Sequence, residues 1–293
     1  MKLSELKYVN GKLLQEGDFY ALGRPRDWQA HRLVSIGNES DLNLIQDDKN
    51  VVSVLASEAL SKNLPKNIGI FVVDNPDAAF QKIHSMLASQ KMFYPEDFEN
   101  RINEKATIHK TAIISDRSVQ IEKNCRIGPK VFIGPQTIVE EGTFIGPGTI
   151  IGTDPSGPPQ ANDGSYLARV GGVRIGRNAW IHANCVVERS IFGGFTEIGD
   201  YTYIDNLVSI GPGTRIGRAC LLVAASVIGE NSDIGDEVWV GPNSVIADGI
   251  KIGNKGSVTM GSVVIDNVPA GMKVTGNFAI DHKKFIEYMR RFS

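Results

Sequence analysis

Two side chains in the central part of the chain are candidates for accepting a proton during a reaction: His182, in the stretch IHAN, and Asp205, in the stretch IDN. A histidine titrates near neutrality, so His182 is the better candidate for a general base, and Asp205 is the alternative. His182 directly follows an aliphatic residue, Ile181. Two other interpretations stay open. A single histidine in such a place can be structural or solvated, and an amine that is already deprotonated needs no base from the protein.

A second pair of residues is suited to binding a substrate. Tyr166 and Arg169 lie in a segment, residues 153–172, that is rich in Pro, Gly, Asn and Asp. An aromatic ring and a fixed cation could contact a sugar and a pyrophosphate. The alternative is that both side chains only pack and solvate the segment.

The element that must position these residues is a repeat of six. Aliphatic residues recur at every sixth position in three runs: Ile127, Ile133, Val139, Ile145 and Ile151; Ile175, Ile181 and Val187; and Ile198, Ile204, Ile210, Ile216, Leu222, Ile228, Ile234, Val240, Ile246, Ile252, Val258 and Val264. A helix has a period near 3.6 and a half-buried strand a period of 2, so neither fits. A fixed long-range period predicts a solenoid.

The positions around each aliphatic residue have their own pattern. Glycine often follows it, as at Gly199 and Gly217, and we expect this to allow tight corners and close backbone approach. Small or β-branched residues stand four positions after the aliphatic residue, and all three cysteines occupy this slot: Cys125, Cys185 and Cys220. We therefore interpret the cysteines as reduced core fillers and not as reactive thiols or a disulfide framework.

The repeat is interrupted twice. Between Ile151 and Ile175 the phase is kept without an aliphatic ladder, which predicts a protruding, functional loop at 153–172. Between Val187 and Ile198 the phase slips, which predicts a reshaped corner around Phe192.

The flanking segments lack the repeat. Strand patterns at 51–55 and 68–73, followed by a helix from Pro76 to about Ala88, predict a small α/β domain over residues 1–104, in which His84 packs on the apolar face of the helix. At the other end, residues 276–293 predict an amphipathic helix with Phe285, Met289 and Phe292 on one stripe. This helix covers the last coil or, in the alternative interpretation, docks an acidic acyl carrier protein.

Composition excludes some partners. The formal net charge is −2 with both signs interspersed, so no basic face favours nucleic acid. No stretch has the length and hydropathy of a membrane span, and the first twenty residues lack the apolar region of a signal peptide, so we expect a cytoplasmic protein.

The six-residue pattern resembles the hexapeptide repeat of the left-handed parallel β-helix over roughly Ala106 to Thr275. The resemblance implies a mainly β fold: a left-handed parallel β-helix over 105–275, joined to the small N-terminal α/β domain and the C-terminal helix. Such folds also carry zinc sites made of three histidines. The repeat region holds only His109 and His182, so we expect no metal site.

Larger features are similar to the UDP-3-O-acylglucosamine N-acyltransferases of lipid A synthesis. They are the N-terminal domain, the entry segment ATIHKTAII, the loop that ends in VGGVRIG, and the tail helix. The ending GSVVIDNVPAGMKVTGNFA resembles the closing segment of coenzyme A-dependent sugar N-acetyltransferases. Both resemblances imply a homotrimer with active sites in clefts between protomers, acyl-CoA or acyl carrier protein as co-substrate, and no tightly bound cofactor. By position in the resemblance, Lys273 and Asn277 are assigned to the donor. Asn206 is a further candidate for binding the acceptor.

The chain also departs from the lipid A enzymes. The place of their catalytic histidine is taken by Pro212, and the places of two further histidines by Ser209 and Gly249. The lipid A enzymes clamp the nucleobase with two aromatic residues and an asparagine between them. In the matching segment LVSIGNESD only the asparagine, Asn38, remains, because Ser35 and Asp41 stand in the two aromatic places.

We therefore expect an acyltransferase that acts on the amino group of a nucleotide-linked amino sugar, in polysaccharide or lipopolysaccharide synthesis. The alternative is a trimer that has lost catalysis and binds a sugar nucleotide or a partner. The sugar, the nucleotide, the acyl chain, the choice between the two donors and that between nitrogen and oxygen as the acylated atom stay open.

Overall fold

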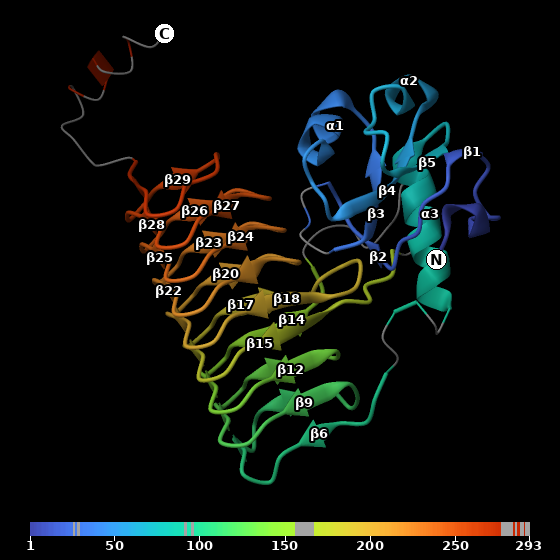
Figure 1. The fold of residues 1–293 in the computed structure, drawn as a ribbon. Helices are drawn as coiled ribbons and strands as arrows, with labels where there is room; N and C mark the ends of the chain where they lie inside the picture. Colours follow the sequence, from blue (N-terminus) through green and yellow to red (C-terminus); the bar gives the residue numbers. More distant parts are fainter. Residues whose placement is uncertain are drawn as a thin grey trace.

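The computed structural model describes residues 1–25, 27, 30–90, 93–94, 97–155, 167–276, 284, 286–287 and 290. Figure 1 shows a small N-terminal domain beside a tall column of stacked coils. The domain has one sheet in the order β1-β5-β4-β3-β2, in which only β1 runs antiparallel to its neighbour. Its elements are η1 (Leu3–Glu5), β1 (Lys12–Gln15), β2 (Ala21–Leu22), β3 (Arg32–Ile36), α1 (Glu39–Ile45), β4 (Val51–Ala56), α2 (Glu58–Ser61), β5 (Gly69–Val72) and α3 (Pro76–Ser89).

The predicted strands and helix of this domain are confirmed by β4, β5 and α3. Helix α3 begins as its sequence indicates, because Asn75 caps it by accepting a hydrogen bond from the Ala78 N–H at 3.0 Å and Pro76 occupies its first turn. His84, on the buried face of α3, is fully buried as expected.

The column is a left-handed parallel β-helix, as predicted, with three parallel sheets as its faces. We name the faces by their outward side chains. The charged face comprises β6 (Arg101–Ile102), β9 (Val119–Ile121), β12 (Thr137–Val139), β15 (Gly172–Ile175), β18 (Phe195–Ile198), β21 (Arg215–Ile216), β24 (Asp233–Ile234) and β27 (Lys251–Ile252). The aromatic face comprises β7 (Thr107–Ile108), β10 (Arg126–Ile127), β13 (Phe144–Ile145), β16 (Trp180–Ile181), β19 (Tyr203–Ile204), β22 (Leu221–Leu222), β25 (Trp239–Val240), β28 (Ser257–Val258) and β30 (Lys273–Val274). The aliphatic face comprises β8 (Ile113–Ile114), β11 (Phe132–Ile133), β14 (Ile150–Thr153), β17 (Val186–Glu188), β20 (Ser209–Ile210), β23 (Val227–Ile228), β26 (Val245–Ile246) and β29 (Val263–Val264).

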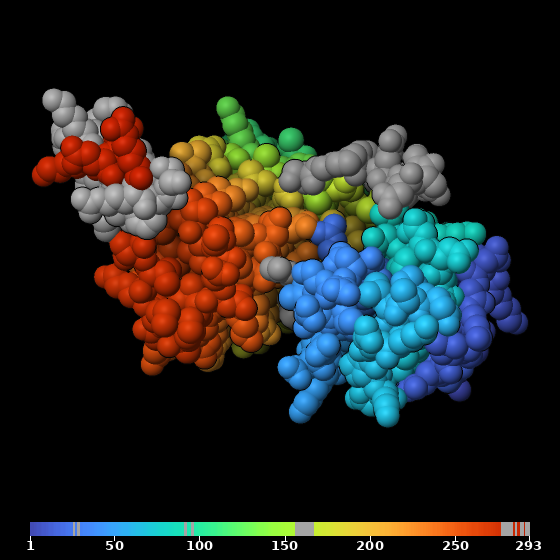
Figure 2. All heavy atoms as spheres, turned by 90° about the horizontal axis from the view of Figure 1, so that it is seen from above, coloured from blue at the N-terminus to red at the C-terminus, as the bar shows by residue number. Residues whose placement is uncertain are grey.

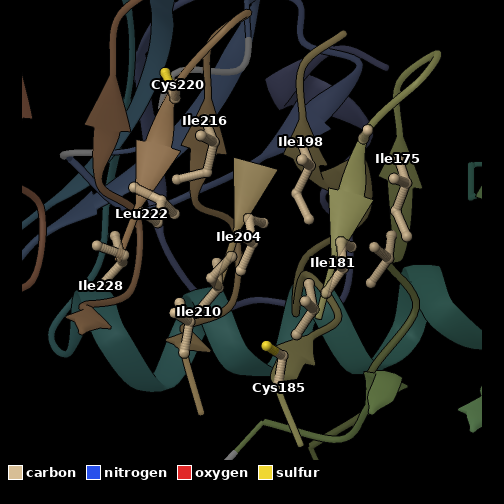
Figure 3. Close-up of a cluster of buried hydrophobic side chains, with 14 of the residues drawn as sticks. Ile175, Ile181, Cys185, Ile198, Ile204, Ile210, Ile216, Cys220, Leu222 and Ile228 are labelled. Atoms are coloured by element: carbon tan, nitrogen blue, oxygen red, sulfur yellow. The ribbon is translucent and has the colours of Figure 1, made fainter. Parts of the chain in front are cut away.

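The core of the column is made by the aliphatic residues of the repeat. From Ile127 to Val264 they are at most 6% exposed and form one continuous cluster. Figure 3 shows several of them, such as Ile181, Ile204 and Ile216, directed into the interior from successive coils. Burial of this ladder away from water is the main stabilising contribution to the column.

The corners of the column differ from the sequence prediction in the role of the glycine. The glycine after the aliphatic residue was expected to allow the tight turn, but the residue with positive φ lies two positions further on, such as Tyr201 at 59° and Ala219 at 52°. The glycine is needed for close approach, because a Cβ at Gly199 would lie 2.5 Å from the backbone of Gly217 in the next coil.

The cysteine slot confirms the core-filler interpretation. Cys125, Cys185 and Cys220 are buried and free, and burial raises the pKa of each thiol, to about 11 for Cys220. The Cys220 thiol donates to the Gly235 carbonyl oxygen of the next coil at 3.0 Å, and in the same slot the Thr202 hydroxyl donates to the Gly217 carbonyl oxygen at 2.7 Å.

The two interruptions attach the N-terminal domain to the column, beside which it lies in Figure 2. The corner around Phe192, where the phase slips, packs against α3: the Phe192 ring lies 5.2 Å from that of Phe80 and 5.0 Å from that of His84. The end of the predicted loop adds a hydrogen bond, since His84 Nε2 lies 2.7 Å from the Ala168 carbonyl oxygen.

The sequence predicted where the column begins and which helix follows its last coil. Its first strand begins at Arg101, slightly before the expected start at 105. Of the predicted helix at 276–293, Lys284, Ile286 and Glu287 are helical, and Phe285, Met289 and Phe292 lie outside the described residues. In the part of the chain that the structure describes, no helix is long and apolar enough to cross a membrane.

Candidate functional site

His182 lies at the centre of an aromatic cluster on the aromatic face. Strand β16 ends at Ile181, and the turn toward the aliphatic face begins with His182. Its imidazole folds back over that face, with centroid distances of 4.7 Å to the Tyr203 ring, 5.9 Å to the Phe144 ring and 6.3 Å to the Trp180 ring. The imidazole is therefore held in place by three rings.

The imidazole has an unused polar atom. His182 Nε2 is buried and has no hydrogen-bond partner among the described residues. A buried imidazole nitrogen without a partner is costly and requires an explanation. The rings beside it are open to solvent, since Trp180 is 41% and Tyr203 37% exposed. A ligand that covers these rings could supply the missing hydrogen bond.

A cation completes the cluster. The Arg126 guanidinium carbon lies 5.2 Å from the Phe144 ring centroid and 5.1 Å from that of Trp180. These are favourable cation–π distances and fix the guanidinium over the aromatic rings. The sequence analysis did not identify Arg126, Phe144, Trp180 or Tyr203. The available signal was their common position, directly before the inward aliphatic residue.

Asp205 and Asn206 lie on the coil next to His182, as the pairing of β16 with β19 requires. The Asp205 carboxylate accepts from the Asn206 N–H at 2.7 Å and from its side-chain amide at 2.9 Å. The side-chain Oδ1 of Asn206 accepts from the Ala183 N–H at 3.1 Å. These bonds stabilise the corner. Within the described residues, no hydrogen bond joins the carboxylate to the His182 imidazole.

Lys273 stands on the same face as His182. Successive strand pairings connect Trp180 in one continuous row of outward positions to Tyr203, Leu221, Trp239, Ser257 and Lys273. With strands about 4.8 Å apart, the row is about 24 Å long. Asn277, the other predicted donor residue, lies outside the described residues.

The structure does not bring Arg169 to the same edge of the chain as His182. Arg169 lies between β14 and β15, at the turn from the aliphatic to the charged face, whereas His182 lies at the turn from the aromatic to the aliphatic face. Within one chain the two residues therefore belong to different sites. Tyr166 lies outside the described residues.

Asn38 has a structural function in the N-terminal domain. Its Oδ1 caps α1 by accepting from the Asp41 N–H at 3.0 Å, and the Ser35 hydroxyl donates to the Asp77 carboxylate at 2.7 Å. The positions of the expected nucleobase clamp are thus engaged in hydrogen bonds within the domain. A contact of Asn38 with a nucleotide stays a prediction.

Pro212, at the position expected for a catalytic histidine, is buried in a corner. One coil further, the same corner carries Glu230, which forms an ion pair with Arg24 of the N-terminal domain. Burial raises the pKa of the nearby Asp27 carboxyl from 3.8 to about 6, and its Oδ1 has no hydrogen-bond partner in the described part of the chain. Sequence analysis missed this interdomain group.

Among the described residues, no three or more His, Cys, Asp or Glu side chains are grouped so that they could hold a metal ion.

Comparison with known proteins agrees with this geometry. The model described as "Bacterial transferase hexapeptide (six repeats)" matches residues 118–153, and "Hexapeptide repeat of succinyl-transferase" matches residues 233–265. The chain therefore contains hexapeptide repeats of the kind found in bacterial transferases. Both matches fall within the column, so the family repeat and the inward ladder are the same feature.

Two curated relatives are similar to this hexapeptide-repeat protein over different lengths. A UDP-3-O-acylglucosamine N-acyltransferase of Nitratidesulfovibrio vulgaris is 47% identical over 58 residues, which is 20% of this chain and 17% of the relative. UDP-3-O-acylglucosamine N-acyltransferase 1 of Francisella tularensis subsp. holarctica is 29% identical over 254 residues, 74% of this chain and 71% of the relative. The chain thus spans only about a sixth of the first relatives it matches.

A solved structure is similar as well. The UDP-N-acetylglucosamine acyltransferase of Francisella novicida covers 64% of this hexapeptide-repeat protein, which covers 73% of that chain, at 22% identity and a TM-score of 0.46.

Proposed function

We propose that the protein is an acyltransferase that moves an acyl group from a thioester donor, acyl-CoA or acyl carrier protein, to the amino group of a nucleotide-linked amino sugar. The amine nitrogen attacks the thioester carbonyl carbon, a C–N bond forms and the C–S bond breaks. The amine loses one proton to a base, and the thiolate leaves and takes up a proton. The names of the relatives support the reaction class, and a cytoplasmic location is part of the proposal.

The observation that carries the proposal is the buried Nε2 of His182, which has no hydrogen-bond partner among the described residues and lies beside exposed aromatic rings. An imidazole held by three rings and not hydrogen-bonded through Nε2 can accept the amine proton without losing a structural bond. The exposed rings of Trp180 and Tyr203 provide an apolar surface that lowers the local dielectric. Asp205, one coil away, is the alternative proton acceptor.

The row from Trp180 to Lys273 supports a place for the donor. It begins beside the proposed base and ends at a cation after about 24 Å. A long pantetheine arm can lie along Leu221 and Trp239 with its thioester near His182. Its phosphate end would then be near Lys273, as the resemblance implies.

The distribution of exposed apolar side chains supports a homotrimer. The aliphatic face exposes Ile113, Ile150, Val227, Val245 and Val263, and the aromatic face exposes Trp180, Tyr203 and Leu221. The third face instead carries ion pairs such as Arg215–Asp233. Two adjacent apolar faces allow the aromatic face of one copy to pack on the aliphatic face of the next, and three such contacts close a ring. His182, between the two faces, would then lie in a cleft.

The trimer is tested by light scattering of two matched variants. Val227→Lys places a charge on the aliphatic face and is expected to shift the mass toward the monomer. Ile138→Lys places the same charge on the charged face, outside the contact, and is expected to leave the mass unchanged. A monomeric parent protein would remove the trimer and the cleft.

The activity is tested by thiol release. The full chain is incubated with amino-sugar nucleotides and either acetyl-CoA or acyl carrier protein, and the free thiol is measured with and without the acceptor. Acceptor-dependent release with one donor is expected. Release without acceptor, or none with any combination, would argue against the proposal.

The buried Pro212 favours a second candidate, a binding protein that has lost catalysis. Calorimetry separates the two. Binding of a nucleotide sugar without binding of coenzyme A or acyl carrier protein would favour the non-catalytic protein, whereas binding of both substrates favours the transferase.

A further inference from the structure

Arg126 lies on the aromatic face, two coils from His182. The pairing of β10 with β13 and of β13 with β16 places Arg126, Phe144 and Trp180 at consecutive outward positions of one row. With strands about 4.8 Å apart, the backbones of Arg126 and Trp180 are about 10 Å apart along this row. The guanidinium carbon of Arg126 nevertheless lies 5.1 Å from the Trp180 ring centroid, so the side chain extends along the row toward the coil of His182.

The guanidinium of Arg126 has aromatic rings beside it but no counter-ion. Among the described residues, its side chain forms no ion pair and no hydrogen bond, and its interactions are the cation–π contacts with Phe144 and Trp180. By contrast, Arg215 at an outward position of the charged face pairs with Asp233 at 2.8 Å. Ring faces attract a cation without accepting its N–H groups in ordinary hydrogen bonds, so the five donors of Arg126 can serve an anionic ligand.

The corner beside this row is bare between His182 and Arg126. Gly146 and Gly128 occupy the place of His182 in the two preceding coils, because all three residues donate the same hydrogen bond, from their N–H to the carbonyl oxygen of the inward aliphatic residue in the next coil. Neither glycine has a side chain, and a Cβ at Gly146 would lie 2.7 Å from the backbone of His182. A ligand that contacts the His182 imidazole can therefore extend past these glycines to the Arg126 guanidinium.

A carboxylate is the anion that fits this arrangement best. One guanidinium binds one carboxylate through two parallel hydrogen bonds, and the two charges neutralise each other. A phosphate monoester carries about two negative charges at pH 7, so one of them would stay uncompensated beside the aromatic rings. The Trp180 ring, which is 41% exposed, offers an apolar surface to the short chain that carries the carboxylate.

We propose that Arg126 is a specificity-determining residue that binds a carboxylate of a substrate beside His182. This inference rests on the proposed function, because it places the carboxylate in one of the two reacting groups. The order of the row favours the acyl group: a donor that extends from Lys273 to His182 directs its acyl end toward Arg126. The favoured donor is then the thioester of a short dicarboxylic acid. An amino sugar that bears a carboxylate is the other source of the same chemistry.

The test is isothermal titration calorimetry of the full chain with two matched pairs of probes. Succinyl-CoA and butyryl-CoA have the same number of acyl carbons and differ in a terminal carboxylate, and a UDP-linked amino sugar differs from its uronic acid form in the same group. The parent is expected to bind the carboxylated member of one pair about tenfold more tightly, the usual effect of a charge-assisted hydrogen bond. Tighter binding of succinyl-CoA assigns the carboxylate to the acyl group, and tighter binding of the uronic acid form assigns it to the acceptor.

Three variants assign the preference to Arg126. Arg126→Gln is expected to abolish it, whereas Arg126→Lys keeps the charge without the two-pronged geometry and is expected to retain part of it. This partial rescue separates recognition of charge from loss of packing against the rings. Arg101→Gln is the matched control, because Arg101 is an exposed arginine of the charged face whose guanidinium carbon lies 5.4 Å from the Phe98 ring centroid. It is expected to keep the preference of the parent.

Equal binding of both members of each pair by the parent, binding of none of the four probes, or a preference that persists in Arg126→Gln would each overturn the inference. The proposed function has its own readout, the release of thiol. Acceptor-dependent release with acetyl-CoA, together with no preference for a carboxylate, would remove the Arg126 site and leave the transferase. A preference that depends on Arg126, without thiol release from any donor, would keep the site and remove the transferase.

Discussion

His84 Nε2 and the carbonyl oxygen of Ala168 lie 2.7 Å apart and join the N-terminal helix α3 to the column. A carbonyl oxygen only accepts, so Nε2 carries the hydrogen and Nδ1 accepts from the Tyr94 hydroxyl at 2.7 Å. Burial lowers the pKa of His84, which is therefore a neutral imidazole with a structural role.

His84→Ala is expected to destabilise the protein by about 2–4 kcal/mol, because it leaves a cavity and two buried polar groups without partners. The folded-state pKa lies below the unfolded value near 6.5. The stability from His84 is therefore complete above pH 6.5 and is lost as pH falls toward the folded-state pKa. Urea denaturation at pH 5 and 7.5 measures both effects. The exposed His109→Ala is the control, and an equal loss there would contradict the assignment.

The pKa of Asp27 changes in the opposite direction from that of His84. Its folded-state pKa is raised from 3.8 to about 6, chiefly by burial. The folded state therefore binds more protons between these values, and stability falls as pH rises from about 4 to 6. Asp27→Asn is expected to be more stable than the parent at pH 7.5, by of the order of 3 kcal/mol at most, and equal to it at pH 4. Thermal denaturation at both pH values checks this, and no gain at pH 7.5 would contradict it.

His182→Ala is expected to lower kcat about 100-fold or more if the imidazole accepts the amine proton, because general bases contribute effects of this size. His109→Ala, the other histidine of the column, is the control. Unchanged turnover in His182→Ala would remove it as the base and leave Asp205 or a substrate already deprotonated.

Cys220 is expected to be inert in the folded protein. Its pKa is raised to about 11 by burial, so almost no thiolate is present at pH 8. A thiol reagent should label the cysteines slowly in buffer and rapidly in urea. Cys220→Thr should cost less than about 1.5 kcal/mol, because threonine fills this slot in neighbouring coils. Rapid labelling of the folded protein would contradict the core-filler assignment.

The sequence by itself determined the column. A strict spacing of six residues has one efficient means of burial, in which every aliphatic side chain stacks on its equivalent in the next coil, so Ile181 and Cys185 were assigned to the core correctly. The capped start of α3 was equally local, because Asn75 and Pro76 act on the backbone beside them.

Only the tertiary structure decided which side chains meet. Arg117 and Arg189 are 72 positions apart in sequence (189 − 117) yet line one cleft, because the coils and the linker bring distant corners together. Outward residues such as Trp180 and Tyr203 are partly exposed to solvent, so burial does not select their residue type. The repeat therefore determines their position in the column but not their chemistry. For the same reason the sequence nominated both His182 and Arg169 as site residues. Only the order of the faces showed that the two residues lie at different corners of the column.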